Sequence, residues 1–331
     1  MNWQRTFCAV FTGSDPVDAD GGSSAAYGKS PSQRTLQEKL TSSIIVLDKP
    51  SGPTSHQVTS WVSEILGVEK TGHSGTLDPA VTGVLPVGTG YALRALDVMN
   101  YLTKEYVGVL RFHSDVSQRE VEWIFSKFTG SIFQVPPVRS AVKRERRTRE
   151  IRSLKLLESR ERRFLFRVEC EAGTYIRTLC VDIGKALCTG AQMEELRRTR
   201  AGPFGEDRAV TLHQLEDAVH YWKKGDERRL REILVPYEEI LSALPSIVLK
   251  DSAVDSICHG ADLTVKGVRR INGTIRRGSV IALMTEKGEG VAIAKALMSG
   301  DSISCSASGI ASDTLRVLMR HGTYPGFRRK S

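Results

Sequence analysis

Residues 70–90 read KTGHSGTLDPAVTGVLPVGTG, and this stretch decides how the rest of the chain is interpreted. Its one carboxylate, Asp78, lies among glycines and small residues and is followed directly by Pro79. Glycine allows turns and close backbone approaches that a residue with a Cβ atom resists. Proline favours an extended conformation in the preceding residue, which tends to present the Asp78 side chain outward from a loop. The pattern therefore predicts a loop that holds a single acid against a bulky partner.

Asp78 is compatible with several roles. A carboxylate acts as a nucleophile, as a general base or as a metal ligand. The plainer interpretation is a structural Asp that caps a turn through its own backbone, as most Asp-Pro pairs do. Metal binding needs companion ligands, and the nearest histidine, His73, stands without ligand-type spacing. We therefore discount a metal and keep both the catalytic and the structural interpretation.

Two residues outside this stretch are candidates to act together with Asp78. Arg177 follows an apolar segment in the sequence GTYIR, where a guanidinium could pair with a carboxylate and keep it ionised. Tyr106, in KEYVG, could stack on a base or supply a hydroxyl group. The alternatives are a surface arginine on an exposed helix face and a tyrosine packed in a strand. Each residue by itself is compatible with both interpretations.

The composition favours a folded protein with a polyanionic partner. Of the 331 residues, 40% are apolar, and the formal net charge at pH 7 is +9. A basic balance of this kind favours nucleic acid over a membrane surface. No apolar run approaches the length of a membrane-spanning helix, and the N-terminus lacks a signal-type apolar core. Six scattered cysteines without a C-x-x-C pair predict reduced thiols, so we expect a cytoplasmic or nuclear location.

Basic residues gather in three parts of the chain. Residues 139–163 hold eleven basic and four acidic residues, which makes this segment a candidate phosphate-contact stripe. A second cluster lies at residues 197–200 and a third at residues 269–277. Any one of them could be a solvated loop, but three together favour nucleic-acid binding. The residues of the first two clusters that we expect to contact RNA are Lys143, Arg144, Arg146, Arg147, Arg197, Arg198 and Arg200.

Composition also divides the chain. Residues 1–40 are rich in Gly, Ser, Asp and Ala without periodicity, which predicts a disordered tail. Strand and helix signals are intermixed over residues 41–243, as in a mixed α/β domain. Short strands and turns over residues 244–325 predict a small β-rich domain. The fold class is therefore α+β.

The expected elements follow from periodicity and capping signals. Helices are predicted at residues 55–66 and 175–187, the first capped by Ser55, and Ser117 with Glu120 predicts a capping box for a third. The predicted strands include 43–47, 105–112 and 164–170, and a hairpin is expected through residues 286–290.

Several segments together resemble the TruB/dyskerin family of RNA pseudouridine synthases. They are LDKPSGPTSHQV (47–58), GHSGTLDPAVTGVLPV (72–87), KEYVG (104–108), PPVRSAVKRERRTR (136–149), EAGTYIRTL (171–179) and ELRRTRAGPF (195–204). KDSAV (250–254) and HGADL (259–263) look like the family's PUA RNA-binding domain. The variants SAVKR and EAGTYIRTL resemble the archaeal and eukaryotic guide-RNA branch. Because the Lys-rich tails of eukaryotic members are missing, we expect an archaeal-type protein. Residues 1–40 match nothing that we know in the family.

The resemblance implies a role for several residues. Asp78 is the family's catalytic aspartate, Arg177 the arginine that pairs with it, and Tyr106 the tyrosine at the flipped base. His73, with Gly72, falls where the family's Gly-His lies against the flipped nucleotide. Residues 41–243 would be the catalytic domain and residues 244–325 the PUA domain.

The implied reaction converts an RNA uridine to pseudouridine without metal, redox cofactor or ATP. The substrate is uridine 55 of the tRNA T-arm, or rRNA selected by an H/ACA guide RNA within a ribonucleoprotein. Relatives in this branch associate with a Nop-type peptide-like protein, a Gly/Arg-rich protein and a kink-turn binder. One alternative is a catalytically idle RNA-binding scaffold of the same fold. The other, a hydrolase, would need a second carboxylate or a metal cluster, and the neighbourhood of Asp78 offers neither.

Overall fold

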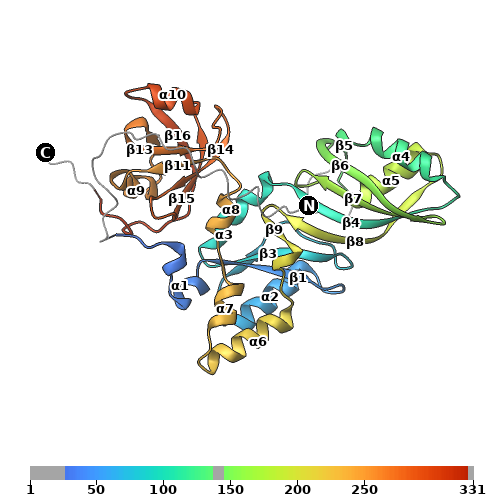
Figure 1. Ribbon diagram of the computed structural model, residues 1–331, viewed down its shortest axis with the longest axis horizontal. Helices are drawn as coiled ribbons and strands as arrows, with labels where there is room; N and C mark the ends of the chain where they lie inside the picture. The colour runs from blue at the N-terminus through green and yellow to red at the C-terminus, as the bar shows by residue number, and fades with distance from the viewer. Residues whose placement is uncertain (1–26, 137–144, 327–331) are drawn as a thin grey trace, which may run out of the picture.

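The computed structural model describes residues 27–136 and 145–326, which fold around two β-sheets (Figure 1). The large sheet runs in the order β10-β1-β3-β8-β4-β7-β6-β5, with β2 paired to β3 and β9 to β8. Its strands are β1 (Ser43–Lys49), β2 (Thr71–His73), β3 (Thr82–Thr89), β4 (Lys104–Phe112), β5 (Gly130–Gln134), β6 (Arg147–Arg160), β7 (Arg163–Cys170), β8 (Ala191–Ala201), β9 (Phe204–Gly205) and β10 (Val235–Pro236).

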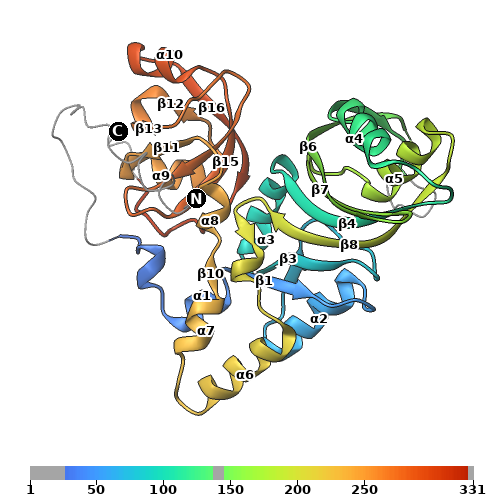
Figure 2. The ribbon, with the colours of Figure 1, turned by 45° about the vertical axis from the view of Figure 1, so that its right-hand side comes forward.

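Helices cover the large sheet in two groups. Figure 2 shows α4 (Gln118–Lys127) and α5 (Ile176–Ala186) against β6 and β7, where their apolar side chains share one buried cluster with β4. At the other end, α2 (Ser55–Leu66), α6 (Leu212–Lys223) and α7 (Arg228–Ile233) pack with β1 and β3 around a second cluster. The shorter helical elements are η2 (Pro31–Gln33), α1 (Leu36–Leu40), α3 (Ala92–Ala95), η3 (Leu96–Tyr101), η4 (Glu206–Arg208) and α8 (Glu238–Leu241).

The small sheet forms a separate lobe beside the large one (Figures 1 and 2). Its strand order is β12-β16-β15-β14-β11-β13. The elements are β11 (Ser246–Leu249), α9 (Asp251–Cys258), β12 (Leu263–Thr264), η5 (Val265–Gly267), β13 (Val268–Asn272), β14 (Val280–Met284), β15 (Gly290–Ala296), α10 (Gly300–Cys305) and β16 (Ile310–Val317). The mixed α+β fold class is therefore confirmed, and β14 with β15 forms the predicted hairpin.

Local sequence accounts for most helix ends. Ser117 accepts a hydrogen bond from the Glu120 amide, and the Glu120 side chain bonds back to Ser117, which is the predicted capping box of α4. In α2 the capping residue is Thr54 rather than Ser55, with Gln57 as its partner. Our assignment was wrong by one residue because Ser55 is buried and bonds the backbone of Leu77 instead.

The centre of the large sheet is the meeting point of β3, β8 and β4. Gly83 of β3 lies opposite Arg198 of β8 in a parallel pair, and Tyr106 of β4 lies opposite the same arginine on the other side. A side chain at Gly83 would collide with the Arg198 backbone carbonyl, so only glycine permits this approach. The loop that carries Asp78 enters β3 at this point.

Ordered structure begins earlier than we expected. Within the segment predicted as a tail, α1 starts with a capping box at Thr35 and buries Leu36 and Leu40 in the cluster under β1. The tail prediction is therefore wrong for residues 31–40, because two well-spaced leucines suffice to dock a single helical turn. Residues 1–26 lie outside the described part of the chain.

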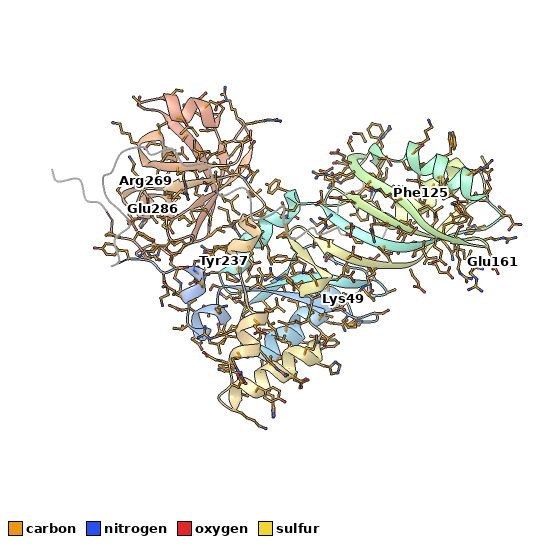
Figure 3. All side chains as sticks on the ribbon, viewed as in Figure 1. Lys49, Phe125, Glu161, Tyr237, Arg269 and Glu286 are labelled. Atoms are coloured by element: carbon orange, nitrogen blue, oxygen red, sulfur yellow. The ribbon has the colours of Figure 1, made fainter. Side chains whose placement is uncertain are left out.

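The two lobes share contacts. Apolar side chains from both sheets form one cluster, which includes Val84, Leu96, Ala282 and Ile293. Tyr237, labelled in Figure 3, donates from its hydroxyl to the carbonyl of Gly290 at 2.8 Å. Over residues 27–136 and 145–326, no helix is long and apolar enough to cross a membrane.

Candidate active site

Asp78 lies on the loop between β2 and β3, and the backbone of this loop is held from several directions. The Ser55 hydroxyl accepts from the Leu77 amide at 2.9 Å and donates to the Leu77 carbonyl at 3.0 Å. The Gly52 amide donates to the Pro79 carbonyl at 2.9 Å. The Asp78 side chain is 51% exposed. The loop therefore presents its acid to solvent from a fixed backbone.

Arg177 is the partner of Asp78. Its Nη2 donates to Asp78 Oδ2 across 99 residues of sequence, and its side chain is 47% exposed. Arg177 stands in the first turn of α5, and the start of this helix is held by Gln134, whose side-chain amide bonds both the NH and the carbonyl of Tyr175. The structure thus brings together the acid and the guanidinium that the sequence predicted, at an accessible position.

Tyr106 lies on β4 near the same loop. Burial raises the pKa of its hydroxyl, while the charge of Arg198 acts in the opposite direction and that of Asp78 adds to the rise. Tyr106 pairs with Arg198 of β8, which pairs in turn with Gly83 at the start of β3, directly after the Asp78 loop. The strand register therefore places the three side chains predicted as catalytic in one part of the large sheet.

Lys49 is a part of this neighbourhood that sequence reasoning missed. Its side chain is fully buried, and its ammonium donates to the carbonyls of Pro50, Pro79 and Val81 at 2.8, 2.9 and 3.0 Å. Figure 3 labels it on the strands of the large sheet. Burial lowers the pKa of Lys49, and the charge of Asp78 opposes that change. The available signal was a lone lysine at the end of the apolar run SIIVLDK.

The structure contradicts our expectation that Arg198 contacts RNA. The side chain is 1% exposed, and it donates from Nε to the Val84 carbonyl at 2.6 Å and from Nη1 to the Gly75 carbonyl at 2.7 Å. Arg197 and Arg198 are successive residues of a strand, so their side chains point to opposite faces and Arg198 points into the protein. A register shift opposite Glu105 and Tyr106 interrupts this alternation before Arg200. A third buried cation, Lys104, bonds backbone carbonyls of Met99 and Leu102, and burial lowers its pKa to about 8.

Arg197 and Arg200 are on the surface but already paired with carboxylates. Arg197 makes two bonds to Asp48, at 2.9 and 3.0 Å, and a further one to Glu206. Arg200 lies 3.5 Å from Glu169 and 3.8 Å from Glu105. Contact of these two arginines with RNA stays a prediction, and an incoming phosphate would compete with those carboxylates.

The stripe at residues 139–163 is described only in part. Arg146 stacks over the exposed Phe133 ring, with its guanidinium carbon 3.9 Å from the ring centroid, and Arg147 begins β6. Lys143 and Arg144 lie outside the described residues. In the small lobe, Arg269 pairs with Glu286 at 2.9 Å, and both are labelled in Figure 3.

His73 ends β2 directly before the Asp78 loop. Its Nδ1 lies 3.1 Å from the Thr59 hydroxyl, and its ring meets that of His56 edge-on at 4.7 Å. Burial, with smaller contributions from His56 and Arg198, lowers the pKa of His73 to about 4. The imidazole is therefore neutral at pH 7 and would contact a nucleotide by packing or hydrogen bonding rather than by charge.

This shift predicts a pH dependence of stability. Between the ordinary pKa of 6.5 and the folded-state pKa of about 4, the unfolded chain takes up a proton on His73 that the folded protein excludes. Stability should therefore fall as the pH drops through this window and stay flat above it as far as His73 is concerned. The Tm of the wild type should be lower at pH 5 than at pH 7. In His73→Gln we expect this difference between the two pH values to be smaller than in the wild type by about one or two degrees, measured by calorimetry. An equal difference in both proteins would contradict the prediction.

Among the described residues, no group of three or more His, Cys, Asp or Glu side chains is arranged to hold a metal ion. The chemistry available at this site is that of one carboxylate, one guanidinium and one phenol. Three further cations, Lys49, Arg198 and Lys104, are buried beneath the loop.

Models of known protein families match four successive parts of this chain. A model described as TruB family pseudouridylate synthase (N terminal domain) matches residues 63–176, and one for the tRNA pseudouridylate synthase B C-terminal domain matches residues 177–242. A PUA domain model matches residues 245–318, and a DKCLD (NUC011) domain model matches residues 21–59. The last match corrects our statement that residues 1–40 match nothing known.

Similar full-length proteins and structures agree with these matches. A probable tRNA pseudouridine synthase B of Archaeoglobus fulgidus is 48% identical over 310 residues, which is 93% of this chain and 95% of that protein. Its counterpart from Methanopyrus kandleri is 49% identical, with 90% and 89% coverage. A chain in the crystal structure of a Cbf5-Nop10-Gar1 complex has a TM-score of 0.89 at 44% identity, with 94% and 95% coverage. A chain in the structure of an H/ACA RNP bound to a substrate RNA containing 2′-deoxyuridine has a TM-score of 0.85 at 42% identity, with 93% and 95% coverage.

Proposed function

The chain belongs to the TruB family of pseudouridylate synthases, and from this premise we propose that it isomerises specific uridines in RNA to pseudouridine. The reaction breaks the N1–C1′ bond, rotates the base and rejoins it through C5. Nothing is oxidised, hydrolysed or carried away. The observation that carries the proposal is the exposed ion pair between Asp78 and Arg177 on a firmly held loop.

The three predicted catalytic residues have distinct roles in this proposal. Asp78, held in an ion pair with Arg177, adds covalently to the sugar or base, or stabilises and deprotonates the sugar. Tyr106 lies against the base through its ring. An idle RNA-binding scaffold is the alternative function, but such a scaffold would have no use for an acid, a guanidinium and a phenol held together.

The target uridine has to leave its stack before this acid can reach it. Unstacking costs a few kcal/mol, which contacts to the flipped base and to the flanking phosphates must offset. In this proposal His73 contacts the flipped nucleotide as a neutral ring. The exposed Arg146 and the partly exposed Arg147 of the basic stripe contact the backbone.

We propose H/ACA guide-selected rRNA as one substrate and uridine 55 of the tRNA T-arm as the other. The first rests on the similarity to chains in Cbf5-Nop10-Gar1 and H/ACA RNP structures, and the second on relatives named probable tRNA pseudouridine synthase B. In the guided mode the chain would assemble with an H/ACA guide RNA and small partners of the Nop10 and Gar1 type. Residues 41–243 would catalyse and residues 244–325 would hold RNA, in the cytoplasm.

The test is release of tritium from RNA that carries 5-labelled uridine, because isomerisation frees the C5 hydrogen and binding alone does not. A tRNA transcript and a guide–target pair are assayed with and without the partner proteins. We expect release from at least one of the two substrates. Binding of both RNAs without release would favour the scaffold.

The basic stripe predicts a change in salt dependence. Replacing Lys143, Arg144, Arg146 and Arg147 by Gln should weaken RNA binding and flatten the plot of log affinity against log salt, by about 0.7–0.9 for each phosphate that the protein no longer neutralises. Filter binding over a salt series measures the slope. The matched control replaces four exposed basic residues of the α6–α7 region, Lys223, Lys224, Arg228 and Arg229. Equal slopes in the wild type and the stripe variant would show that the stripe faces solvent.

A further inference from the structure

Arg198 is a fully buried charge without a carboxylate partner. The side chain is 1% exposed, and no acidic group pairs with it in the described part of the chain. One of its nitrogens, Nη2, is buried and makes no hydrogen bond there. Buried charges are normally paired, because removing a charge from water is expensive. The pKa of the nearby Lys104 is lowered by burial and further by the like charge of Arg198. A position this unfavourable for stability indicates a function.

On one side, Arg198 holds the loop that carries Asp78. Its Nη1 and Nε bond the carbonyls of Gly75 and Val84, which flank the acid on the two sides of the loop. The fit is close, since a Cβ atom added at Gly75 would lie 2.9 Å from Nη1. Gly75 also has a φ of +70°, where a side chain is strained. A movement of the guanidinium would therefore move the acid.

On the other side, Arg198 lies against Tyr106. The two residues face each other across β4 and β8. The charge of Arg198 lowers the pKa of the Tyr106 hydroxyl against the larger effect of burial. Nη2, the buried nitrogen without a hydrogen bond, is the donor of this guanidinium that remains available. A guanidinium has donors only, so a phenol oxygen within reach of Nη2 would accept from it, and the phenol hydrogen would then be directed elsewhere.

We propose that Arg198 is a positioning residue that couples the Asp78 loop to the Tyr106 hydroxyl through a single guanidinium. It fixes the distance between acid and phenol and orients the phenol hydrogen away from the sheet. The inference rests on the proposed isomerase function and deepens it. The role needs the planar, multiply donating guanidinium, which explains why an arginine rather than a lysine occupies the position.

The test combines Arg198→Lys with Tyr106→Phe. Arg198→Lys keeps the charge but loses the planar donor set, so we expect the single-turnover rate at saturating RNA to fall about ten- to a hundredfold, with RNA affinity within about threefold. In the Tyr106→Phe background the same change should lower the rate by less than about threefold, because its target hydroxyl is gone. A purely structural role predicts the same loss in both backgrounds.

A second measurement needs no turnover. We expect the backbone amides of residues 74–84 to exchange with deuterium faster in Arg198→Lys than in the wild type, because the carbonyls of Gly75 in the loop and Val84 in β3 lose their donors. Arg167→Lys, an exposed position on β7, is the matched control for both measurements. If Arg198→Lys fails to fold, Gly75→Ala is used in its place, because the added methyl group moves the same guanidinium from the exposed side of the loop.

Two results would overturn the inference: equal rate losses in both backgrounds, or loop exchange unchanged from the wild type. Failure of the proposed function looks different, since the wild-type protein would then release no tritium from any RNA. In that case the exchange measurement still decides whether Arg198 holds the loop.

Discussion

Asp78→Asn is expected to lower tritium release from 5-labelled uridine in RNA by about a thousandfold or more. Asparagine keeps the size of the side chain and its place on the loop but loses the negative charge. It can therefore neither add to the substrate nor accept a proton. The ion pair with Arg177 is lost with the charge. Both side chains of this pair are about half exposed. Single-turnover assays with labelled RNA measure the rate.

Binding separates this effect from misfolding. RNA affinity should stay within a few-fold, because the loop is held through its backbone by Ser55, Gly52 and Lys49 rather than through the carboxylate. Asp115→Asn is the matched control, since this aspartate is 89% exposed and pairs with Arg162 far from the loop. Turnover near the wild-type rate in Asp78→Asn would refute the role of this acid.

Lys49→Met is expected to lower the free energy of unfolding by about 1–3 kcal/mol, because the buried Val81 carbonyl is left without a donor, while the Pro79 carbonyl keeps that of the Gly52 amide. The ammonium serves the carbonyls of Pro50, Pro79 and Val81, and methionine fills its space without offering any donor. Activity should fall as well, since two of these carbonyls belong to the Asp78 loop. Urea unfolding followed by circular dichroism measures the change.

The control for Lys49 is Lys224→Met, an exposed lysine after α6, for which we expect a change within about 0.5 kcal/mol. Unfolding of Lys49→Met at the wild-type urea concentration would mean that water can replace the ammonium. In that case the loop would owe its position to Ser55, Gly52 and Arg198.

Much of the fold could be predicted because its signals are local. The capping box at Ser117, the alternation of β7 and the apolar stripe of α2 each lie within about a dozen residues, the range over which helix and strand periodicities act. The cap of α2 was misplaced although its signal is also local. Thr54 has Gln57 three residues later, which is the capping-box pattern, whereas Ser55 has Val58 at that position and bonds the backbone of Leu77 instead.

The start of the ordered chain could not be predicted in the same way. The composition of residues 1–40 predicts a tail, yet α1 is docked by the cluster under β1 and by an ion pair between Arg34 and Glu238. The ion pair joins residues 204 positions apart, and the cluster includes residues as distant as Leu230 and Leu234. A short segment with little periodicity can therefore be ordered by its neighbours together with its own capping box.

The residue types around Asp78, Tyr106 and Arg177 allowed a pair between an acid and a cation to be predicted, and the kind of reaction followed from the resemblance of several motifs to the TruB/dyskerin family. Which basic residues meet solvent, and which lie beneath the loop, was decided by the tertiary structure alone. Arg197 and Arg198 are adjacent and identical in charge, but strand alternation and the approach of β3 put one on the surface and the other in the interior. The free energy of a charge depends on the water and the donors or acceptors around it, and for Arg198 and Lys49 these come from distant parts of the chain.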